Sequence, residues 1–116
     1  MNALNAIVHP KVKLHFESWV QQNKTDKILI KEAAILIESG AYKDLDRLIV
    51  VNSPSVLRIS RVSSRDHLNE SEVKKRIAAQ LSDEERLKYA NYVINNNEKD
   101  LVIPQVLNIY NALLNL

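Results

Sequence analysis

Three arginines stand close together in one stretch of this 116-residue chain. They are Arg58, Arg61 and Arg65 of the segment SPSVLRISRVSSRD, residues 53–66. On a helix, spacings of three and four residues place side chains on one face. The planar guanidinium group of arginine matches phosphate oxygens two at a time and stays charged at any working pH. The spacing therefore raises the question of whether an anionic ligand lies against this face.

A second helix after this stretch would add Arg76 and Gln80 on one face. Arginines from two successive helices can close over a polyphosphate and neutralise the charge that develops during phosphoryl transfer. The competing interpretation is a solvated basic face, relieved by the neighbouring carboxylates Asp66, Glu70 and Glu72. Spacing alone leaves both interpretations open.

The composition restricts the possible classes of function. The net charge is only +2, from 16 basic and 14 acidic residues, so we expect no nucleic-acid partner and no anionic membrane. No cysteine is present, no apolar run is long enough to span a bilayer, and residues 1–13 do not read as a signal peptide. We therefore expect a cytoplasmic protein. With Gly40 as the single glycine, the chain has no phosphate-cradling loop of the G-x-x-x-x-G-K-[ST] type.

Apolar runs and capping residues predict alternating helices and strands. Helices are expected over residues 9–24, with Pro10 in the first turn, and over a short segment that stops at Gly40. Ser53 is expected to cap the arginine helix, and Asn69 and Ser82 the two helices that follow. Strands are expected at residues 28–30, 48–51 and 91–96, and a closing helix after residue 102. Strands separated by helices indicate an α/β domain with a parallel sheet.

The order of these motifs resembles that of one enzyme family. Residues 50–96 read VVNSPSVLRISRVSSRDHLNESEVKKRIAAQLSDEERLKYANYVINN. This resembles the C-terminal half of dephospho-CoA kinases, with a small-residue–Pro turn, a helix ending in R-x-x-x-R-D, a lid helix ending in A-A-Q, an E-E-[KR] segment and a strand close to V-I-D-N. Upstream, LNAIVHPKV and ILIESGAYKDLDRLIVV resemble the family's H-P and L-L-F-E-S-G segments. The resemblance covers nearly all of the chain.

The resemblance implies a fold and an activity. The fold would be the three-layer parallel-sheet fold of P-loop kinases, with a helical lid. The activity would be transfer of the ATP γ-phosphate to the ribose 3′-hydroxyl of dephospho-CoA, in coenzyme A synthesis, with Mg²⁺. Four segments follow from the match: CoA-side helices and first strand in 1–46, strand and arginine helix in 47–66, lid helices in 67–90, and last strand and helix in 91–116.

The resemblance also assigns roles to individual residues. Arg61 and Arg65 match the lid arginines that face the nucleotide phosphates, and Arg76 and Gln80 match the second lid helix. Asn96 matches the asparagine near the adenine. His9 and Glu38 match the CoA-substrate side, although a histidine bonded to local backbone and a surface carboxylate remain alternatives. Arg58 stands where the family often has another polar residue, and Glu98 where it has glycine or another small residue.

The family's P-loop, with its lysine, and its catalytic aspartate are absent from this sequence. We therefore expect an incomplete kinase domain, a fragment with no catalytic residue or metal ligand of its own, inactive as an isolated chain. In the family the P-loop strand lies between the strands expected at residues 28–30 and 48–51. The open edges predict either a strand-swapped homo-oligomer or direct pairing of these two strands.

Two other classes of function remain open. One is a non-catalytic nucleotide- or anion-binding module that uses Arg61, Arg65 and Arg76. The other is an adaptor whose arginine face meets an acidic protein partner.

Overall fold

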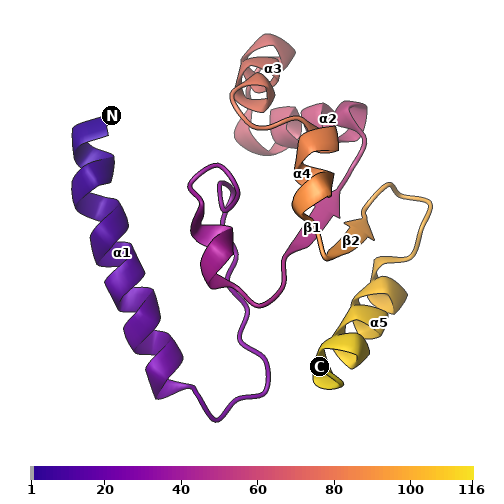
Figure 1. Cartoon of the computed structure of the whole chain (residues 1–116). Helices are drawn as coiled ribbons and strands as arrows, with labels where there is room; N and C mark the ends of the chain where they lie inside the picture. Colours follow the sequence, from indigo (N-terminus) through magenta and orange to yellow (C-terminus); the bar gives the residue numbers. More distant parts are fainter. Residues whose placement is uncertain (1) are drawn as a thin grey trace. The chain divides into compact units, whose positions relative to one another are not determined.

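The computed structural model describes residues 2–116, and side chains from residue 3 onward (Figure 1). Its elements are α1 (Asn2–Gln22), the 3-10 helix η1 (Ala41–Asp44), β1 (Ile49–Asn52), α2 (Ser55–Asp66), α3 (Glu70–Ala78), α4 (Asp83–Tyr89), β2 (Tyr92–Asn95) and α5 (Val102–Leu114). The chain divides after Glu32 into two compact units.

The first unit consists of α1 and the segment that follows it. The helix predicted over residues 9–24 is formed, but Pro10 does not lie in its first turn, because α1 begins at Asn2 and carries Pro10 inside it. Proline inside a helix lacks the N–H that would bond the carbonyl four residues earlier, so one α1 hydrogen bond cannot form. Near the other end of the helix, the rings of Phe16 and Trp19 stack with centroids 5.9 Å apart, and Lys31 Nζ lies 4.2 Å from the centre of the Phe16 ring.

The strand predicted at residues 28–30 is not formed. These residues have no regular secondary structure, and Ile30 is 76% exposed. A β-strand satisfies its backbone groups by pairing with a neighbour, and the sheet in residues 2–116 contains β1 and β2 alone.

The second unit is built around this two-stranded parallel sheet. Ile49 of β1 lies opposite Tyr92 of β2, and the register continues to the facing pair Asn52 and Asn95. The crossover between the strands runs through α2, α3 and α4 (Figure 1). The α/β class and the parallel pairing that the sequence predicted are thus confirmed.

The helix caps follow the sequence signals in two of three cases. The Asn69 side chain accepts the Glu72 N–H at 3.0 Å, and Glu72 Oε2 accepts the Asn69 N–H at 3.3 Å, which is the predicted capping box. Ser82 caps α4 by accepting the backbone N–H of Glu85 at 3.2 Å. The Ser53 cap was wrong, because α2 begins one residue later than predicted and the buried Ser53 hydroxyl accepts a hydrogen bond from Arg61 instead.

The apolar core of the second unit is small. Among the described residues, the buried hydrophobic side chains are those of Leu48 before β1, Val73 in α3 and Ile109 in α5. Gln105 ties α5 to β2, because its side chain accepts the Asn95 N–H at 2.8 Å and donates to the Asn95 carbonyl at 3.1 Å. Within residues 2–116, no helix has the length and apolar character needed to cross a membrane.

Candidate functional site

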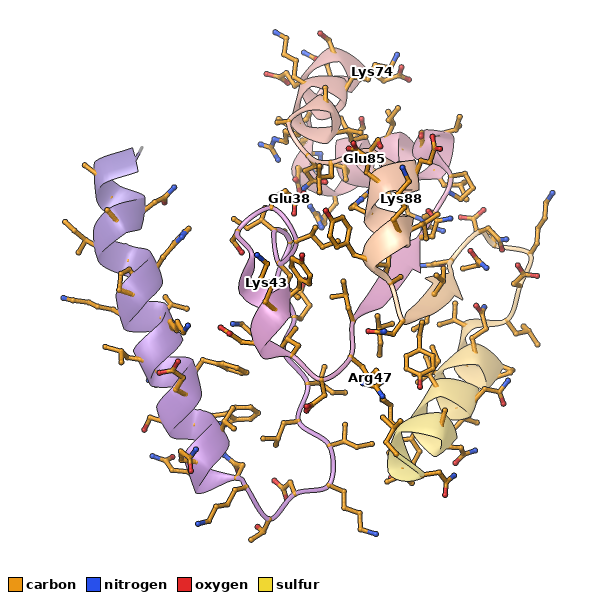
Figure 2. The ribbon with its side chains drawn as sticks, viewed as in Figure 1. Glu38, Lys43, Arg47, Lys74, Glu85 and Lys88 are labelled. Carbon is orange, nitrogen blue, oxygen red and sulfur yellow. The ribbon has the colours of Figure 1, made fainter. Side chains whose placement is uncertain are left out.

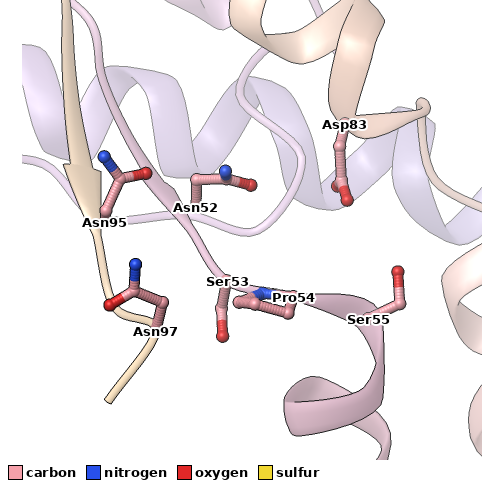
Figure 3. A pocket seen from close by; sticks show the side chains of 7 residues that line it. All are labelled: Asn52, Ser53, Pro54, Ser55, Asp83, Asn95 and Asn97. Atoms are coloured by element: carbon pink, nitrogen blue, oxygen red, sulfur yellow. The ribbon is translucent and has the colours of Figure 1, made fainter. Parts of the chain in front are cut away.

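β1 and β2 end at the same edge of the sheet, and a hollow of about 270 Å³ lies there (Figure 3). Its lining comes from the two strand ends, the start of α2 and the start of α4: Asn52, Ser53, Pro54, Ser55, Asp83, Asn95 and Asn97. In open α/β sheets, ligands bind outside the carboxyl ends of the strands. Amide and hydroxyl groups dominate the lining, so the hollow offers hydrogen bonds more than charge. Such a surface suits a base or a sugar.

Arg61 connects α2 to the end of β2 beside this hollow. Its Nη1 donates to the Ser53 hydroxyl at 3.2 Å and to the Asn96 carbonyl at 3.4 Å, and its Nη2 donates to Glu98 at 3.1 Å. Asn96 extends the parallel pairing, because its N–H donates to the Asn52 carbonyl at 2.8 Å. Arg61 and Asn96, both predicted site residues, are therefore in direct contact.

Arg65 and Arg76 come together on a single carboxylate. Arg65 binds both oxygens of Asp66, through Nε at 2.7 Å and Nη2 at 3.1 Å, and Arg76 Nη1 donates to the same Oδ2 at 3.3 Å. The hydrogen bond from Arg65 holds the pKa of Asp66 below its usual range, and Arg76 adds to the effect. The hydrogen bond to Asp66 in turn raises the pKa of Arg65. Arg65 and Asp66 lie at the end of α2 and Arg76 in the last turn of α3, and both guanidinium groups remain largely exposed.

Arg58 belongs to a different cluster. Its Nη2 donates to Asp83 Oδ2 at 2.5 Å, and the other Asp83 oxygen accepts a hydrogen bond from Arg86. The Nε atoms of Arg58 and Arg86 are both buried without a hydrogen-bond partner in the structure. Because Asp83 also lines the hollow, this cluster joins α2 and α4 directly beside it. Arg58 and Arg65 lie on the same helix but bind different carboxylates, Arg58 that of Asp83 and Arg65 that of Asp66.

Two further predicted site residues lie outside the helices: Glu38 in the segment before η1, and Gln80 in the linker between α3 and α4. Glu38 Oε1 accepts a hydrogen bond from the backbone N–H of Leu81 at 3.2 Å. Gln80 does not lie on the same helix as Arg76, which corrects the sequence interpretation. The helix ends at Ala78, and the Gln80 N–H bonds the Ile77 carbonyl at 3.1 Å as the chain turns toward the cap of α4.

His9 lies on α1 in the first unit and is exposed. No cluster of three or more His, Cys, Asp or Glu side chains suited to a metal ion occurs within the described part of the chain.

Comparison with known proteins identifies the family. The family model described as "CoaE: Dephospho-CoA kinase" matches residues 1–101. The chain belongs to the dephospho-CoA kinase family. Among curated dephospho-CoA kinases, that of Chlorobaculum tepidum is 43% identical over 115 residues, covering 97% of this chain and 55% of the relative. That of Bacteroides fragilis strain YCH46 is 39% identical over 106 residues, covering 91% of this chain and 52% of the relative.

A third relative, the dephospho-CoA kinase of Fusobacterium nucleatum, is 41% identical over 97 residues, covering 84% of this chain and 50% of the relative. The chain thus spans about half the length of the dephospho-CoA kinases that it matches. These matches confirm the family that the arginine, lid and last-strand motifs predicted.

One departure from the expected dephospho-CoA kinase pattern falls where the backbone itself favours glycine. Glu98, where glycine or a small residue is usual, has a φ of 66°, in the left-handed region that glycine enters without steric cost. Its side chain forms the ion pair with Arg61. Sequence reasoning noted the substitution but did not foresee this contact, because the ion pair joins residues 37 positions apart.

Proposed function

We propose that this chain supplies the lid and the nucleotide-binding edge of a dephospho-CoA kinase. Such an enzyme transfers the γ-phosphate of ATP to the ribose 3′-hydroxyl of dephospho-CoA in coenzyme A biosynthesis, in the cytoplasm. The main support is one observation: the helix with the family's R-x-x-x-R-D motif leaves directly from the hollow at the carboxyl ends of β1 and β2. We further propose that the two strands belong to the three-layer sheet of P-loop kinases.

We expect the arginines to contact different phosphates of the nucleotide. Arg65 and Arg76 would meet the phosphates, because their guanidinium groups lie together and are 73% and 63% exposed. Arg61 would face the phosphate nearest the sheet, since its ion pair with Glu98 is itself partly exposed and can yield to a stronger anion. Asn96 would lie near the base, beside the amide-rich hollow.

The remaining roles are further from the nucleotide. We propose that His9 and Glu38 lie on the dephospho-CoA side and that Gln80 belongs to the lid. Mg²⁺ would bridge the ATP phosphates, but we assign it no ligand in this chain. Because the sequence has no G-x-x-x-x-G-K-[ST] segment, we expect the chain alone to bind nucleotide without transferring phosphate. ADP formed in step with phosphorylated coenzyme A, by chain free of host kinase, would contradict that expectation.

Titration calorimetry of the full chain with ATP tests the proposed function. Arg65→Ala and Arg76→Ala should each weaken ATP binding by about tenfold, because each removes a charge-assisted hydrogen bond to phosphate. Lys74→Ala is the matched control, since Lys74 is an equally exposed cation of α3. An equal loss in all three variants would indicate general attraction between charges and would remove the support for a specific lid.

A further inference from the structure

Glu38 makes a contact that its expected place beside the CoA substrate does not explain. Its carboxylate accepts the backbone N–H of Leu81 at 3.2 Å, although the two residues are 43 positions apart. Leu81 lies in the short linker that joins α3 to α4. In Figure 2, Glu38 stands at the end of its turn that faces these two helices.

The backbone N–H groups of the linker divide between α3 and Glu38. The N–H groups of Ala79 and Gln80 bond back to the carbonyls of Lys75 and Ile77 in α3, at 3.2 and 3.1 Å. The next N–H, that of Leu81, bonds to Glu38 instead of α3. Carbonyl groups of α3 thus accept the N–H groups of the first two residues after the helix. The N–H of the third residue, Leu81, is accepted by a carboxylate from another segment.

The segment that carries Glu38 is itself held in place. The Gly40 N–H bonds the Ile37 carbonyl at 3.0 Å, and the Tyr42 N–H bonds the Leu36 carbonyl at 3.1 Å. Gly40 allows this tight path because its φ of 77° lies in the left-handed region. The ring of Tyr42 also meets that of Tyr89 edge-on, with centroids 5.1 Å apart. The turn therefore contacts the linker before α4 and α4 itself.

We propose that Glu38 is a positioning residue for the lid. Its carboxylate fixes the linker at Leu81, and the linker keeps Arg76 and Gln80 in the orientation that receives the nucleotide phosphates. This inference rests on the proposed function of Arg76 as a phosphate-binding residue. It differs from that function in assigning Glu38 an effect on ATP binding without any contact with ATP.

Two substitutions at Glu38 separate a positioning role from direct contact with the ligand. Glu38→Gln keeps a side-chain oxygen that can accept the Leu81 N–H, whereas Glu38→Ala removes the acceptor. Hydrogen exchange of the Leu81 amide, read by NMR on the full chain, reports the contact without any ligand. Titration calorimetry with ATP reports its consequence. Glu32→Ala serves as a control, because it removes an exposed carboxylate from the other unit.

We expect Glu38→Ala to speed exchange at Leu81 by about tenfold, since a hydrogen bond to a charged group is lost. ATP affinity should fall by about two- to tenfold, because a lid side chain must then be ordered on binding. Glu38→Gln should retain most of both properties, and Glu32→Ala should change neither.

Two results with the Glu38 variants would overturn the inference directly. One is unchanged Leu81 exchange in Glu38→Ala. The other is an equal loss of ATP affinity in the Ala and Gln variants with Leu81 still protected, which would make Glu38 a direct ligand contact. If the unaltered chain fails to bind ATP, the proposed function fails and the positioning role fails with it. Tight ATP binding that depends on Arg76 but not on Glu38 would remove the positioning role alone.

Discussion

At the scale of single residues, carboxylates decide what each arginine of α2 can do. Arg58 meets Asp83, Arg61 meets Glu98, and Arg65 meets Asp66. The sequence interpretations of a phosphate site and of a face relieved by carboxylates are therefore not exclusive. Exposed ion pairs contribute little stability and yield readily to a stronger anion. The pairs at Asp66 and Glu98 each include one largely exposed side chain, whereas both side chains of the Arg58–Asp83 pair are partly buried.

Asp66 provides a titration that tests its local geometry. Its pKa should lie below the usual aspartate range, with Arg65 the main cause. Because the pKa is lowered in the folded state, the stabilising contribution is complete above the ordinary aspartate pKa and is lost as pH falls through the lowered value. Arg65→Leu should raise the Asp66 pKa more than Arg76→Leu, as carboxyl-carbon NMR would show.

Lys74→Leu is the control for that titration, because Lys74 also lies on α3 but pairs with Glu70. It should leave the Asp66 pKa unchanged. A larger shift from Arg76→Leu than from Arg65→Leu would mean that the two-oxygen contact with Arg65 is not the dominant one in solution.

Candidate site residues could be predicted from the sequence where a motif carries them, but their partners could not. Arg61, Arg65 and Arg76 follow from the family pattern of the lid. The contacts of Arg61 with Asn96 and of Glu38 with Leu81 join residues 35 and 43 positions apart, and no local spacing encodes them. Asp83 reads as an ordinary acidic residue in the first turn of a helix, so its contact with two arginines was missed.

At the scale of elements, the cluster of Asp83 with Arg58 and Arg86 fastens α2 to α4. Asp83→Asn should destabilise the chain by about 1–3 kcal/mol, because two partly buried guanidinium groups would then share one neutral side chain. Urea unfolding followed by circular dichroism measures this change. Glu70→Gln is the control: its pair with Lys74 is exposed, and its loss should cost less than about 0.5 kcal/mol. Equal changes in the two variants would show that the cluster does not fasten the helices.

Element prediction succeeded where local chemistry is sufficient and failed where a partner is needed. The capping box at Asn69 acts within four residues, so the sequence alone predicts the start of α3. The apolar run at residues 28–30 has the composition of a strand, but a strand exists only when another strand lies beside it. Pro10 shows a different limit, because the residues before it form helix despite the lost hydrogen bond.

At the scale of the whole molecule, the second unit has a small core and much exposed apolar surface. Val51 in β1 is 59% exposed, and Ile103 and Leu107 in α5 are 74% and 54% exposed. A sheet of two strands leaves each strand with one unpaired edge, and such sheets are only marginally stable by themselves. Unpaired edges favour association with a second chain.

The expected consequence is self-association through the strand edges, which sedimentation velocity over a range of protein concentrations would detect. A charge placed on a strand opposes edge-to-edge pairing, so Val51→Lys should shift the chain toward monomer. Ile103→Lys is the matched comparison, because it places the same charge at a more exposed apolar position on α5. If only Ile103→Lys dissociates the oligomer, the chains associate through α5 and not through the sheet. A chain that remains monomeric at every concentration would show that β1 and β2 are protected without a partner, contrary to the open edges of this sheet.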